Sequence, residues 1–275
     1  MDESKGYLVE QFGLHGRTVV ITGGAGVLAS SMAEALLSAG AHVSLWGRHE
    51  ESLQESASRV GLAAKAVDRV DWVLADAQSE GSMEEATRAC VQRHGRIDVL
   101  VNAVGGNRGK TAFLDTDITL FEEVLKLNLV AGFMVPTKVL CRHWIERKEH
   151  ASVINMASMS SYVPLSGVWA YDAAKAAVLN LTMAAAKEFA PHGIRVNAIA
   201  PGFFLGKQNK ALLVDEKTGN LTQRGRDIIS RTPFARFGNP EDLAGATVFL
   251  ASEKASGFVT GICIPVDGGF LVDCV

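Results

Sequence analysis

The sequence predicts a single α/β domain over residues 1–275, built on a doubly wound parallel sheet of seven strands with helices on both faces. Three observations favour this fold class. Short apolar runs rich in β-branched residues alternate with longer stretches of helical periodicity, as expected when helices connect parallel strands. The length of 275 residues and the apolar fraction of 48% suit one α/β domain with a large core. No linker rich in Pro, Gly or Ser divides the chain, and no internal repeat is found.

Each predicted element follows from its residue pattern. The strands are short, mainly apolar runs, in chain order Thr18–Thr22, Val43–Trp46, Asp71–Ala75, Ile97–Val101, Ser152–Met156, Arg195–Ala200 and Gly261–Val266. The helices carry apolar residues at helical spacing and cover Ala29–Ala39, Glu50–Val60, Met83–His94, Leu120–Arg147, Tyr171–Ala190 and Glu241–Ala251. Residues 203–236 interrupt the alternation, and an insertion of this length is typical of a lid over a functional site.

Composition and charge exclude several classes of protein. A net charge of −3 argues against a nucleic-acid binder that works through bulk charge. The N-terminus carries acidic residues and no secretory signal, and no stretch approaches the roughly 18 apolar residues of a membrane span. We therefore expect a cytoplasmic protein with no membrane partner. The cysteines form no CxxC pair, which predicts reduced thiols and no metal site at Cys90, Cys141, Cys263 and Cys274.

The first strand runs into a glycine-rich turn, Thr22–Ala29, that opens the next helix. Glycines let the backbone approach a pyrophosphate closely, and the helix N-terminus offers free N–H groups and the positive end of its dipole. A glycine-rich turn alone is a weak signal, since such turns also occur without a ligand. Placed between a strand and a helix, this one predicts a dinucleotide site formed by Thr22, Gly23, Gly24, Gly26, Val27 and Leu28.

The end of the second strand bears on the choice of cofactor. An acidic residue there would bind the adenosine ribose hydroxyls and favour NAD, but the position holds Gly47. Arg48 can instead pair with a 2′-phosphate, because a guanidinium suits phosphate geometry. We therefore predict NADP, with NAD as the alternative if Arg48 is only a solvated surface residue. Further cofactor contacts are expected after the third and fourth strands, from Asp76, Ala77, Asn102, Ala103 and Gly105.

Four polar side chains form the predicted catalytic set. Tyr171 and Lys175 are four residues apart in a helix and therefore share one face. A nearby ammonium lowers the pKa of a tyrosine, which makes Tyr171 a usable acid for a carbonyl or base for an alcohol. Lys175 can also donate to the nicotinamide ribose hydroxyls. Ser158, after the fifth strand, can bind the substrate oxygen, and Asn128, in the long helix, can hold a water behind Lys175.

Together with the glycine turn, these residues resemble those of the short-chain dehydrogenase/reductase superfamily over essentially the full chain. The resemblance rests on residues 22–29, Asn102, Asn128, Ser158, Tyr171-x-x-x-Lys175, Arg195-Val196-Asn197, Pro201-Gly202 and Val266-Asp267-Gly268-Gly269. It implies a Rossmann-like fold, catalysis by the serine, tyrosine and lysine, and a proton relay completed by the asparagine. It also implies a homo-oligomer, often a tetramer, and NAD(P) contacts that include Tyr171, Lys175, Pro201, Gly202 and Phe204.

A narrower resemblance, to the D-mannonate oxidoreductase (fructuronate reductase) branch, lies mainly in the C-terminal third. It rests on Ala200–Leu205, Gln208-Asn209, Ala211–Leu213, Thr232-Pro233, Arg236–Gly238 and, further upstream, Gly105–Asn107. This resemblance implies that the substrate is a sugar acid, with D-fructuronate reduced to D-mannonate or the reverse.

The charge of the lid also suits an anionic small-molecule substrate. Residues 203–236 contain seven basic and three acidic side chains, in a chain whose net charge is −3. A basic lid over a carbonyl site would steer and bind a carboxylate, although a solvated helical lid has the same pattern. The predicted substrate contacts, with buried packing as the alternative for at least one of the two aromatic residues, are Ser158, Asn107, Trp169, Phe204, Lys207 and Asn209.

Three functions therefore remain open. The first is an NAD(P)-dependent sugar-acid oxidoreductase. The second is the same chemistry on another substrate, such as a 3-oxoacyl thioester or a polyol, and a more apolar groove is expected for the thioester. The third is a nucleotide-binding regulator without catalysis, but such a protein has no physical need for the complete catalytic set.

Overall fold

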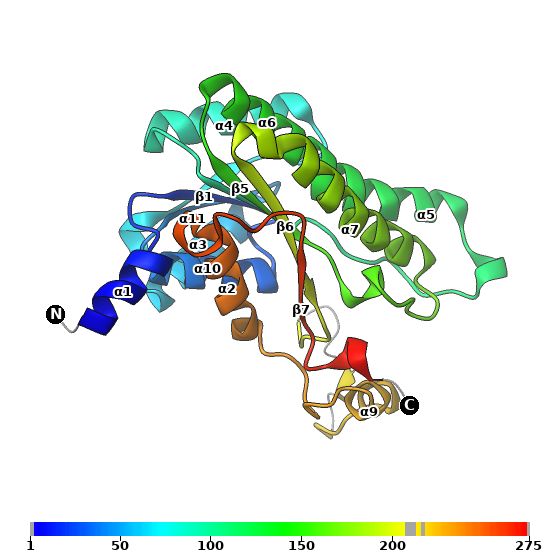
Figure 1. The fold of residues 1–275 in the computed structure, drawn as a ribbon. Helices are drawn as coiled ribbons and strands as arrows, with labels where there is room; N and C mark the ends of the chain where they lie inside the picture. The colour runs from blue at the N-terminus through cyan, green and yellow to red at the C-terminus, as the bar shows by residue number, and fades with distance from the viewer. Residues whose placement is uncertain (1–2, 207–212, 216–217, 274–275) are drawn as a thin grey trace.

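Figure 1 shows the computed structural model, which describes residues 3–206, 213–215 and 218–273, as a sheet covered by helices on both faces. Within these residues, the seven strands of the sheet are all parallel and follow the order β3-β2-β1-β4-β5-β6-β7. They are β1 (Thr18–Thr22), β2 (His42–Gly47), β3 (Val70–Leu74), β4 (Val99–Asn102), β5 (Ala151–Met156), β6 (Ile194–Pro201) and β7 (Cys263–Val266). The predicted α/β fold class is confirmed, with each strand end within two residues of its expected place.

The helices divide between the two faces of the sheet (Figure 1). One face is covered by α2 (Val27–Ser38), α3 (Glu50–Ala63) and α10 (Ala244–Ala251). The other is covered by α4 (Glu80–His94), α5 (Ile118–Leu125), α6 (Val135–Arg147) and α7 (Trp169–Phe189), with α7 running beside α5. The short helices α1 (Glu3–Phe12), α9 (Gln223–Ser230) and α11 (Glu253–Ser256) are not predicted by the sequence pattern.

Strand side chains alternate between the two helical layers. On β1, Val19 and Ile21 pack with residues of α2, α3 and α10, whereas Val20 packs with residues of α4, α6 and α7. Each large apolar side chain buried in this way contributes about 1.5–3 kcal/mol relative to its exposed state. Because helices cover both faces, the strands are apolar throughout instead of alternating with polar residues. This packing fixes the carboxyl ends of the strands, where the predicted site residues lie.

The long helix predicted over Leu120–Arg147 is a continuous helical rod whose winding changes along its length. α5 passes into a π-helical segment, Lys126–Met134, which is followed by α6. The rod is long and apolar enough by composition to cross a membrane, contrary to the expectation that no stretch would qualify. However, 61% of its most apolar window is buried inside the protein, as in the core helix of a globular fold.

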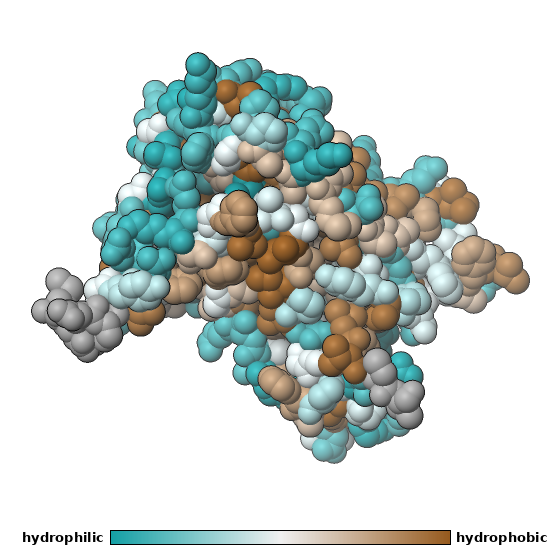
Figure 2. All heavy atoms as spheres, viewed as in Figure 1, coloured by the Kyte–Doolittle hydropathy of each residue, from teal (hydrophilic) through white to brown (hydrophobic). Residues whose placement is uncertain are grey.

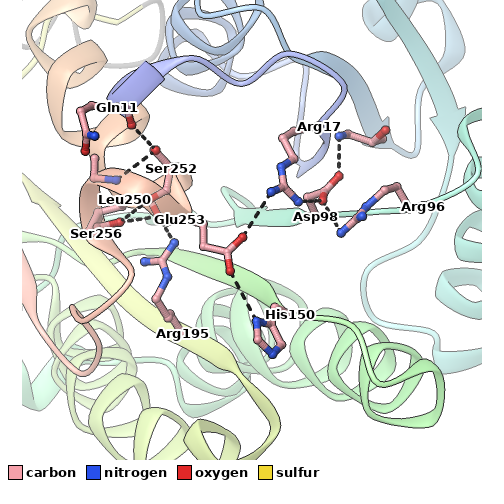
Figure 3. A network of polar contacts seen from close by, with 12 residues as sticks. Gln11, Arg17, Arg96, Asp98, His150, Arg195, Leu250, Ser252, Glu253 and Ser256 are labelled. Carbon is pink, nitrogen blue, oxygen red and sulfur yellow. Dashed lines mark hydrogen bonds and ion pairs between the residues drawn. The ribbon is translucent and has the colours of Figure 1, made fainter. Parts of the chain in front are cut away.

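A polar network closes the amino edge of the sheet (Figure 3). Asp98, just before β4, pairs with Arg17 at 2.7 Å and with Arg96 at 2.6 Å. Glu253 on α11 pairs with Arg17 at 3.2 Å and with His150 at 3.4 Å. A cavity of about 710 Å³ lies among these groups. It is at the edge opposite the carboxyl ends of the strands, and most of its charged side chains pair with one another, so it is not the site of the predicted chemistry.

The thiols of the described residues form no disulfide. Cys90 and Cys141 are buried, and burial raises the pKa of each thiol to about 12, which makes both unreactive near neutral pH. Cys263 is a free thiol on β7, and Cys274 lies outside the described residues. Among the residues with assigned positions, no group of three or more His, Cys, Asp or Glu side chains is arranged to hold a metal ion.

Candidate active site

The carboxyl edge of the sheet holds the predicted dinucleotide turn. The strand order reverses between β1 and β4, and ligands bind in the crevice at such a reversal in doubly wound sheets. Gly23, directly after β1, has a φ of +65°, and a Cβ there would lie 3.0 Å from the carbonyl oxygen of Ala103. A Cβ on Gly24 would lie 2.7 Å from the Cβ of Leu45. Glycine is therefore required where the turn passes between these neighbouring strands.

The start of α2 offers the donors that a pyrophosphate needs. Gly26 is the N-cap residue, with an extended backbone and no side-chain cap. The N–H groups of the first helical turn, which begins with Val27 and Leu28, have no partner within the helix, and the helix dipole adds to their attraction for an anion. Thr22 is buried beneath the turn, where its hydroxyl donates to the Val101 carbonyl at 3.4 Å. These residues fit the diphosphate of a dinucleotide.

On the adenosine side of the crevice, the predicted residues follow β2 and β3. Arg48 is exposed, and Gly47 packs against Leu53, whose Cδ2 lies 3.3 Å from the position of a Cβ. The Asp76 carboxylate accepts from the N–H of Gln78 at 3.0 Å and so stabilises its own turn. The guanidinium of Arg48 is exposed at this end, and its pairing with a phosphate stays a prediction.

Asn102, one of the predicted cofactor contacts, has a structural role in this fold. Its side chain is fully buried, and its amide nitrogen donates to Thr137 Oγ1 and to Asn155 Oδ1, both at 2.9 Å. Asn155 donates in turn to Thr182 Oγ1 at 3.0 Å. This network joins β4 and β5 to α6 and α7. The Asn102 side chain thus faces the core layer and positions the end of β4, and a contact of this residue with the cofactor stays a prediction.

Tyr171 and Lys175 share one face of α7, as their spacing predicts. Lys175 is buried, and its ammonium donates to the carbonyl of Met156 at the end of β5 at 2.7 Å. Its Nζ atom lies 5.6 Å from the centre of the Tyr171 ring. The last residue of β5 therefore holds the ammonium beside the phenol.

Burial governs the protonation of this pair. It lowers the pKa of Lys175 to about 8 and raises the pKa of Tyr171 above its ordinary value. The hydrogen bond between Ser158 and the phenol lowers the Tyr171 pKa again, and the charge of Asp172 adds to the increase. Lys175 is not among the causes of this shift, so the expectation that its ammonium lowers the pKa of Tyr171 stays a prediction. Tyr171 is held as the neutral phenol, which is the form that donates a proton to a carbonyl oxygen.

Asn128 comes from the π-helical segment and lies close to Lys175. Its side-chain nitrogen donates to the carbonyls of Gly106 at 2.8 Å and Val124 at 2.9 Å, and its oxygen accepts from the N–H of Gly106 at 3.1 Å. A Cβ on Gly105 would lie 2.7 Å from Asn128 Oδ1 and 3.2 Å from Lys175 Nζ. Gly105 therefore packs directly on both side chains. π-Helical turns are frequent at functional sites, and this one presents a catalytic candidate.

Substitution of Gly105 is expected to damage the site while the fold survives. In Gly105→Ala, the new methyl group must displace Asn128 or Lys175, and a displacement of about 1 Å at such a site costs on the order of 100-fold in rate. We expect kcat/KM to fall by about that factor, with an unchanged far-UV circular dichroism spectrum. Gly81→Ala, at a helical glycine with open space around it, is the control and should keep full activity.

Ser158 is held in place by the turn that follows β5. Its hydroxyl accepts from the N–H of Ser160 at 3.1 Å. The Ser161 hydroxyl accepts from the N–H of Ser158 at 3.3 Å and donates to the Lys175 carbonyl at 2.6 Å. Ser161 was not predicted, although its spacing from Ser158 matches a capping box. Met156 was also missed, because a backbone carbonyl leaves no signal in the residue type.

The predicted substrate residues are only partly brought together. Asn107 is exposed and Trp169 half-buried, and both line a cavity of about 50 Å³ between residues 107–117, α5 and the start of α7. The Trp169 indole donates to the Thr111 carbonyl at 3.1 Å, which ties this segment to α7. Phe204 is only 6% exposed and packs on Gly238, which favours the alternative of core packing, and its predicted contacts with substrate and cofactor stay predictions. Lys207 and Asn209 lie outside the described residues.

Ion pairs reduce the free positive charge around the site. Arg236, at the end of the predicted lid, forms two hydrogen bonds with the carboxylate of Asp242, at 2.7 and 3.1 Å. Arg108, in the facing segment, pairs with Glu123 at 2.7 Å. A seven-to-three excess of basic residues in the lid therefore overstates the charge available to an anionic substrate.

Comparison with known proteins agrees with this geometry. Residues 24–271 match the family model described as enoyl-(acyl carrier protein) reductase. The uncharacterized oxidoreductase UxuB of Bacillus subtilis is 40% identical over 272 residues, which cover 94% of this chain and 96% of the relative. The 2-dehydro-3-deoxy-D-gluconate 5-dehydrogenase of the same organism is 36% identical over 266 residues, or 97% of this chain and 99% of the relative.

Solved structures share the whole fold. A protein from Haemophilus influenza assigned as a D-mannonate oxidoreductase, with bound NAD, has a TM-score of 0.85 at 32% identity and covers 97% of this chain and 98% of its own. A gluconate 5-dehydrogenase from Burkholderia cenocepacia in complex with NADP and tartrate has a TM-score of 0.85 at 31% identity and covers 97% and 99%. The chain therefore belongs to the short-chain dehydrogenase/reductase family of NAD(P)-dependent oxidoreductases.

Proposed function

We propose that the protein interconverts a carbonyl and an alcohol on a sugar acid of the hexonate or hexuronate type. The observation that carries the proposal is the buried ammonium of Lys175, held by the Met156 carbonyl beside Tyr171 and close to Gly105. The names of the relatives support the substrate class, since they include a gluconate 5-dehydrogenase and a 2-dehydro-3-deoxy-D-gluconate 5-dehydrogenase.

Each catalytic side chain has a distinct proposed role. Tyr171 donates its phenolic proton to the carbonyl oxygen during reduction and takes a proton from the alcohol during oxidation. Ser158 binds the same oxygen and stabilises the charge that develops on it. Lys175 stabilises the phenolate that remains, and Asn128 keeps the lysine in position through the contact that both make with Gly105. The bound nicotinamide cofactor supplies or accepts the hydride.

NADP is the proposed cofactor, with NAD as the alternative. Arg48 is exposed at the end of β2. Position 47 holds a glycine, which has no carboxylate to bind the ribose hydroxyls of NAD. The structural relatives include one with bound NADP and one with bound NAD, so they support a nicotinamide cofactor of either kind. The preference for NADP therefore rests on Arg48.

Loss of the Arg48 charge is expected to act on one cofactor alone. In Arg48→Gln, the KM for NADPH should rise about tenfold, because a charge-assisted hydrogen bond to phosphate is removed. The KM for NADH should stay the same, since NADH has no 2′-phosphate. Initial rates with both nucleotides measure the effect, and an equal change in the two KM values would contradict the assignment.

A substrate panel tests the proposed function. Oxidation of NADPH and NADH is followed at 340 nm with D-fructuronate, D-tagaturonate, 5-ketogluconate and an acetoacetyl thioester. Turnover of a sugar acid but not of the thioester supports the proposal. Turnover of the thioester alone would favour the second function, which the name of the matching family model also suggests. Cofactor binding without turnover of any carbonyl would favour a nucleotide-binding regulator.

We also propose that the protein forms a homo-oligomer, with a tetramer as the expected state. Several large apolar side chains are exposed on the segment before α5, on the helical rod and on α7, namely Phe113, Leu114, Ile118, Met134 and Met183. Figure 2 shows apolar surface at the end of the molecule where α5 begins. Sedimentation velocity should give four times the chain mass of 29.3 kDa, and a sedimenting monomer would contradict this prediction.

A further inference from the structure

A chain of polar side chains lies behind the glycine turn, where α2 and α3 pack side by side (Figure 1). The Ser56 hydroxyl of α3 donates to the carbonyl oxygen of Gly24 at 3.1 Å. The same hydroxyl lies 3.0 Å from Oγ of Ser30 on α2, which accepts from Nη2 of Arg59 at 2.8 Å. Ser30 and Ser56 are only 1% and 3% exposed, so this chain reaches the turn through the interior of the protein.

The two ends of the chain fix the direction of every hydrogen bond in it. A carbonyl oxygen can only accept, so Ser56 gives its single proton to Gly24 and must accept from Ser30. A guanidinium can only donate, so Arg59 is the first donor. The donors therefore point from Arg59 through the two serines to the turn. A cationic donor polarises the hydroxyls that follow it, which strengthens the last bond, to Gly24.

The backbone of Gly24 is held on both sides. Its N–H donates to the carbonyl of Trp46 on β2 at 3.1 Å, and its carbonyl accepts from Ser56. Because the trans peptide is planar, the N–H of Ala25 points in the opposite direction to the Gly24 carbonyl. Gly24 is buried and Ala25 is exposed, so the oxygen is turned into the protein and the N–H outwards. Among the residues with described positions, this N–H has no hydrogen-bond partner.

We propose that Ser56 is a positioning residue for cofactor binding. Together with Ser30 and Arg59, it holds the Gly24 carbonyl towards α3, so that the Ala25 N–H and not this oxygen faces the diphosphate. The inference rests on the proposed function, since it places the diphosphate at the glycine turn. The partial negative charge of a carbonyl oxygen would repel the diphosphate, whereas an N–H attracts it.

Loss of the Ser56 hydroxyl would weaken binding through the conformation of the turn. Glycine gives the backbone freedom to rotate, so the peptide after Gly24 is no longer fixed when its hydrogen bond to Ser56 is removed. Molecules with the rotated peptide do not bind the diphosphate. The apparent Kd then rises in inverse proportion to the fraction of molecules that keep the binding conformation.

Ser56→Ala removes the donor to Gly24 and has a matched control in Ser152→Ala. Ser152 is 2% exposed, and its hydroxyl donates to the Leu250 carbonyl at 2.9 Å, at the amino edge of the sheet and away from the turn. Each substitution deletes one buried hydroxyl that donates to a backbone carbonyl, so both should lower the melting temperature to a similar extent. Only Ser56→Ala should weaken cofactor binding.

Titration with NADH and NADPH, followed by the fluorescence of the bound nucleotide, measures the effect. In Ser56→Ala, the Kd should rise about tenfold for both nucleotides, because the diphosphate is common to them. Arg48→Gln differs, since it is expected to act on NADPH alone. A Kd in Ser56→Ala equal to that of Ser152→Ala would show that Ser56 only stabilises the fold, and would overturn the proposal. A rise for one nucleotide alone would also overturn it.

Substitutions further along the chain test its direction. Ser30→Ala leaves Ser56 able to donate to Gly24 but removes the group that polarises it, and Arg59→Gln removes the charge at an exposed position. The Kd for both nucleotides should rise about threefold in Ser30→Ala and about twofold in Arg59→Gln, because these residues act only through Ser56. A larger rise in Arg59→Gln than in Ser56→Ala would contradict the proposed chain.

These measurements need no turnover, so the two proposals can fail separately. Failure of every carbonyl compound in the substrate panel would reject the proposed function, while the Kd values would still decide the role of Ser56. A wild-type protein that binds neither NADH nor NADPH would overturn both.

Discussion

Tyr171→Phe is expected to lower kcat/KM by about 1,000-fold, because it removes the proton donor of the carbonyl oxygen. The phenol is the group that Lys175 and Ser158 surround, and neither can replace it: Lys175 is bonded to the Met156 carbonyl and the Ser158 hydroxyl caps a turn. The loss should fall mainly on kcat, since the interaction is needed in the transition state. Initial rates with the best substrate of the panel measure it.

The control for this substitution is Tyr7→Phe, at an exposed tyrosine on α1. It should keep full activity. Both variants should bind the cofactor with the affinity of the wild type, measured by the fluorescence of the bound reduced nucleotide. Retention of more than about a tenth of the wild-type rate in Tyr171→Phe would mean that another group transfers the proton.

Lys175→Met is expected to lose about 1,000-fold in kcat/KM and to lose the pH dependence of stability that the buried ammonium gives the wild type. Burial lowers the pKa of Lys175 from 10.5 to about 8 in the folded protein. Below pH 8 the ammonium is charged in both states, so the full cost of burying it is present. The cost disappears as the pH rises through 8 towards 10.5, where the folded protein carries a neutral amine.

The stability of Lys175→Met relative to the wild type should therefore be greater at pH 7 than at pH 10.5. The difference is on the order of 2–3 kcal/mol, given the size of the pKa shift. Urea unfolding at the two pH values measures it. Lys187→Met, at an exposed position on the same helix, should show no such dependence. A constant difference between variant and wild type would show that Lys175 titrates normally.

The features that could be predicted from the sequence are those set by local patterns. Strand–helix alternation gives the parallel sheet, and the spacing of Tyr171 and Lys175 gives their common face. The glycines of the first turn predict its close packing, because a side chain at Gly23 or Gly24 would collide with Ala103 or Leu45. In each case the residue type or the spacing carries the physical reason by itself.

The features that the sequence could not predict depend on tertiary surroundings. In a strand buried on both sides, the apolar pattern does not tell which layer a polar residue such as Asn102 faces. The aromatic ring of Phe204 can line a pocket or fill a core, and its packing on Gly238 is a tertiary contact that the residue type does not reveal. The pKa of Tyr171 depends on burial, which the spacing of two residues does not reveal.

The π-helical segment Lys126–Met134 joins α5 to α6 in one continuous helical rod, and the number of residues in this segment sets the rotation of one end relative to the other. α5 packs on α7 and α6 packs on α4, so the two ends of the rod contact different helices. Deleting or inserting one residue within the segment would rotate one end by about 100° relative to the other. Either Asn128 would leave the active site or the buried face of α6 would turn to solvent. Substitutions on exposed faces of the rod should therefore be tolerated, whereas any change in the number of residues should not.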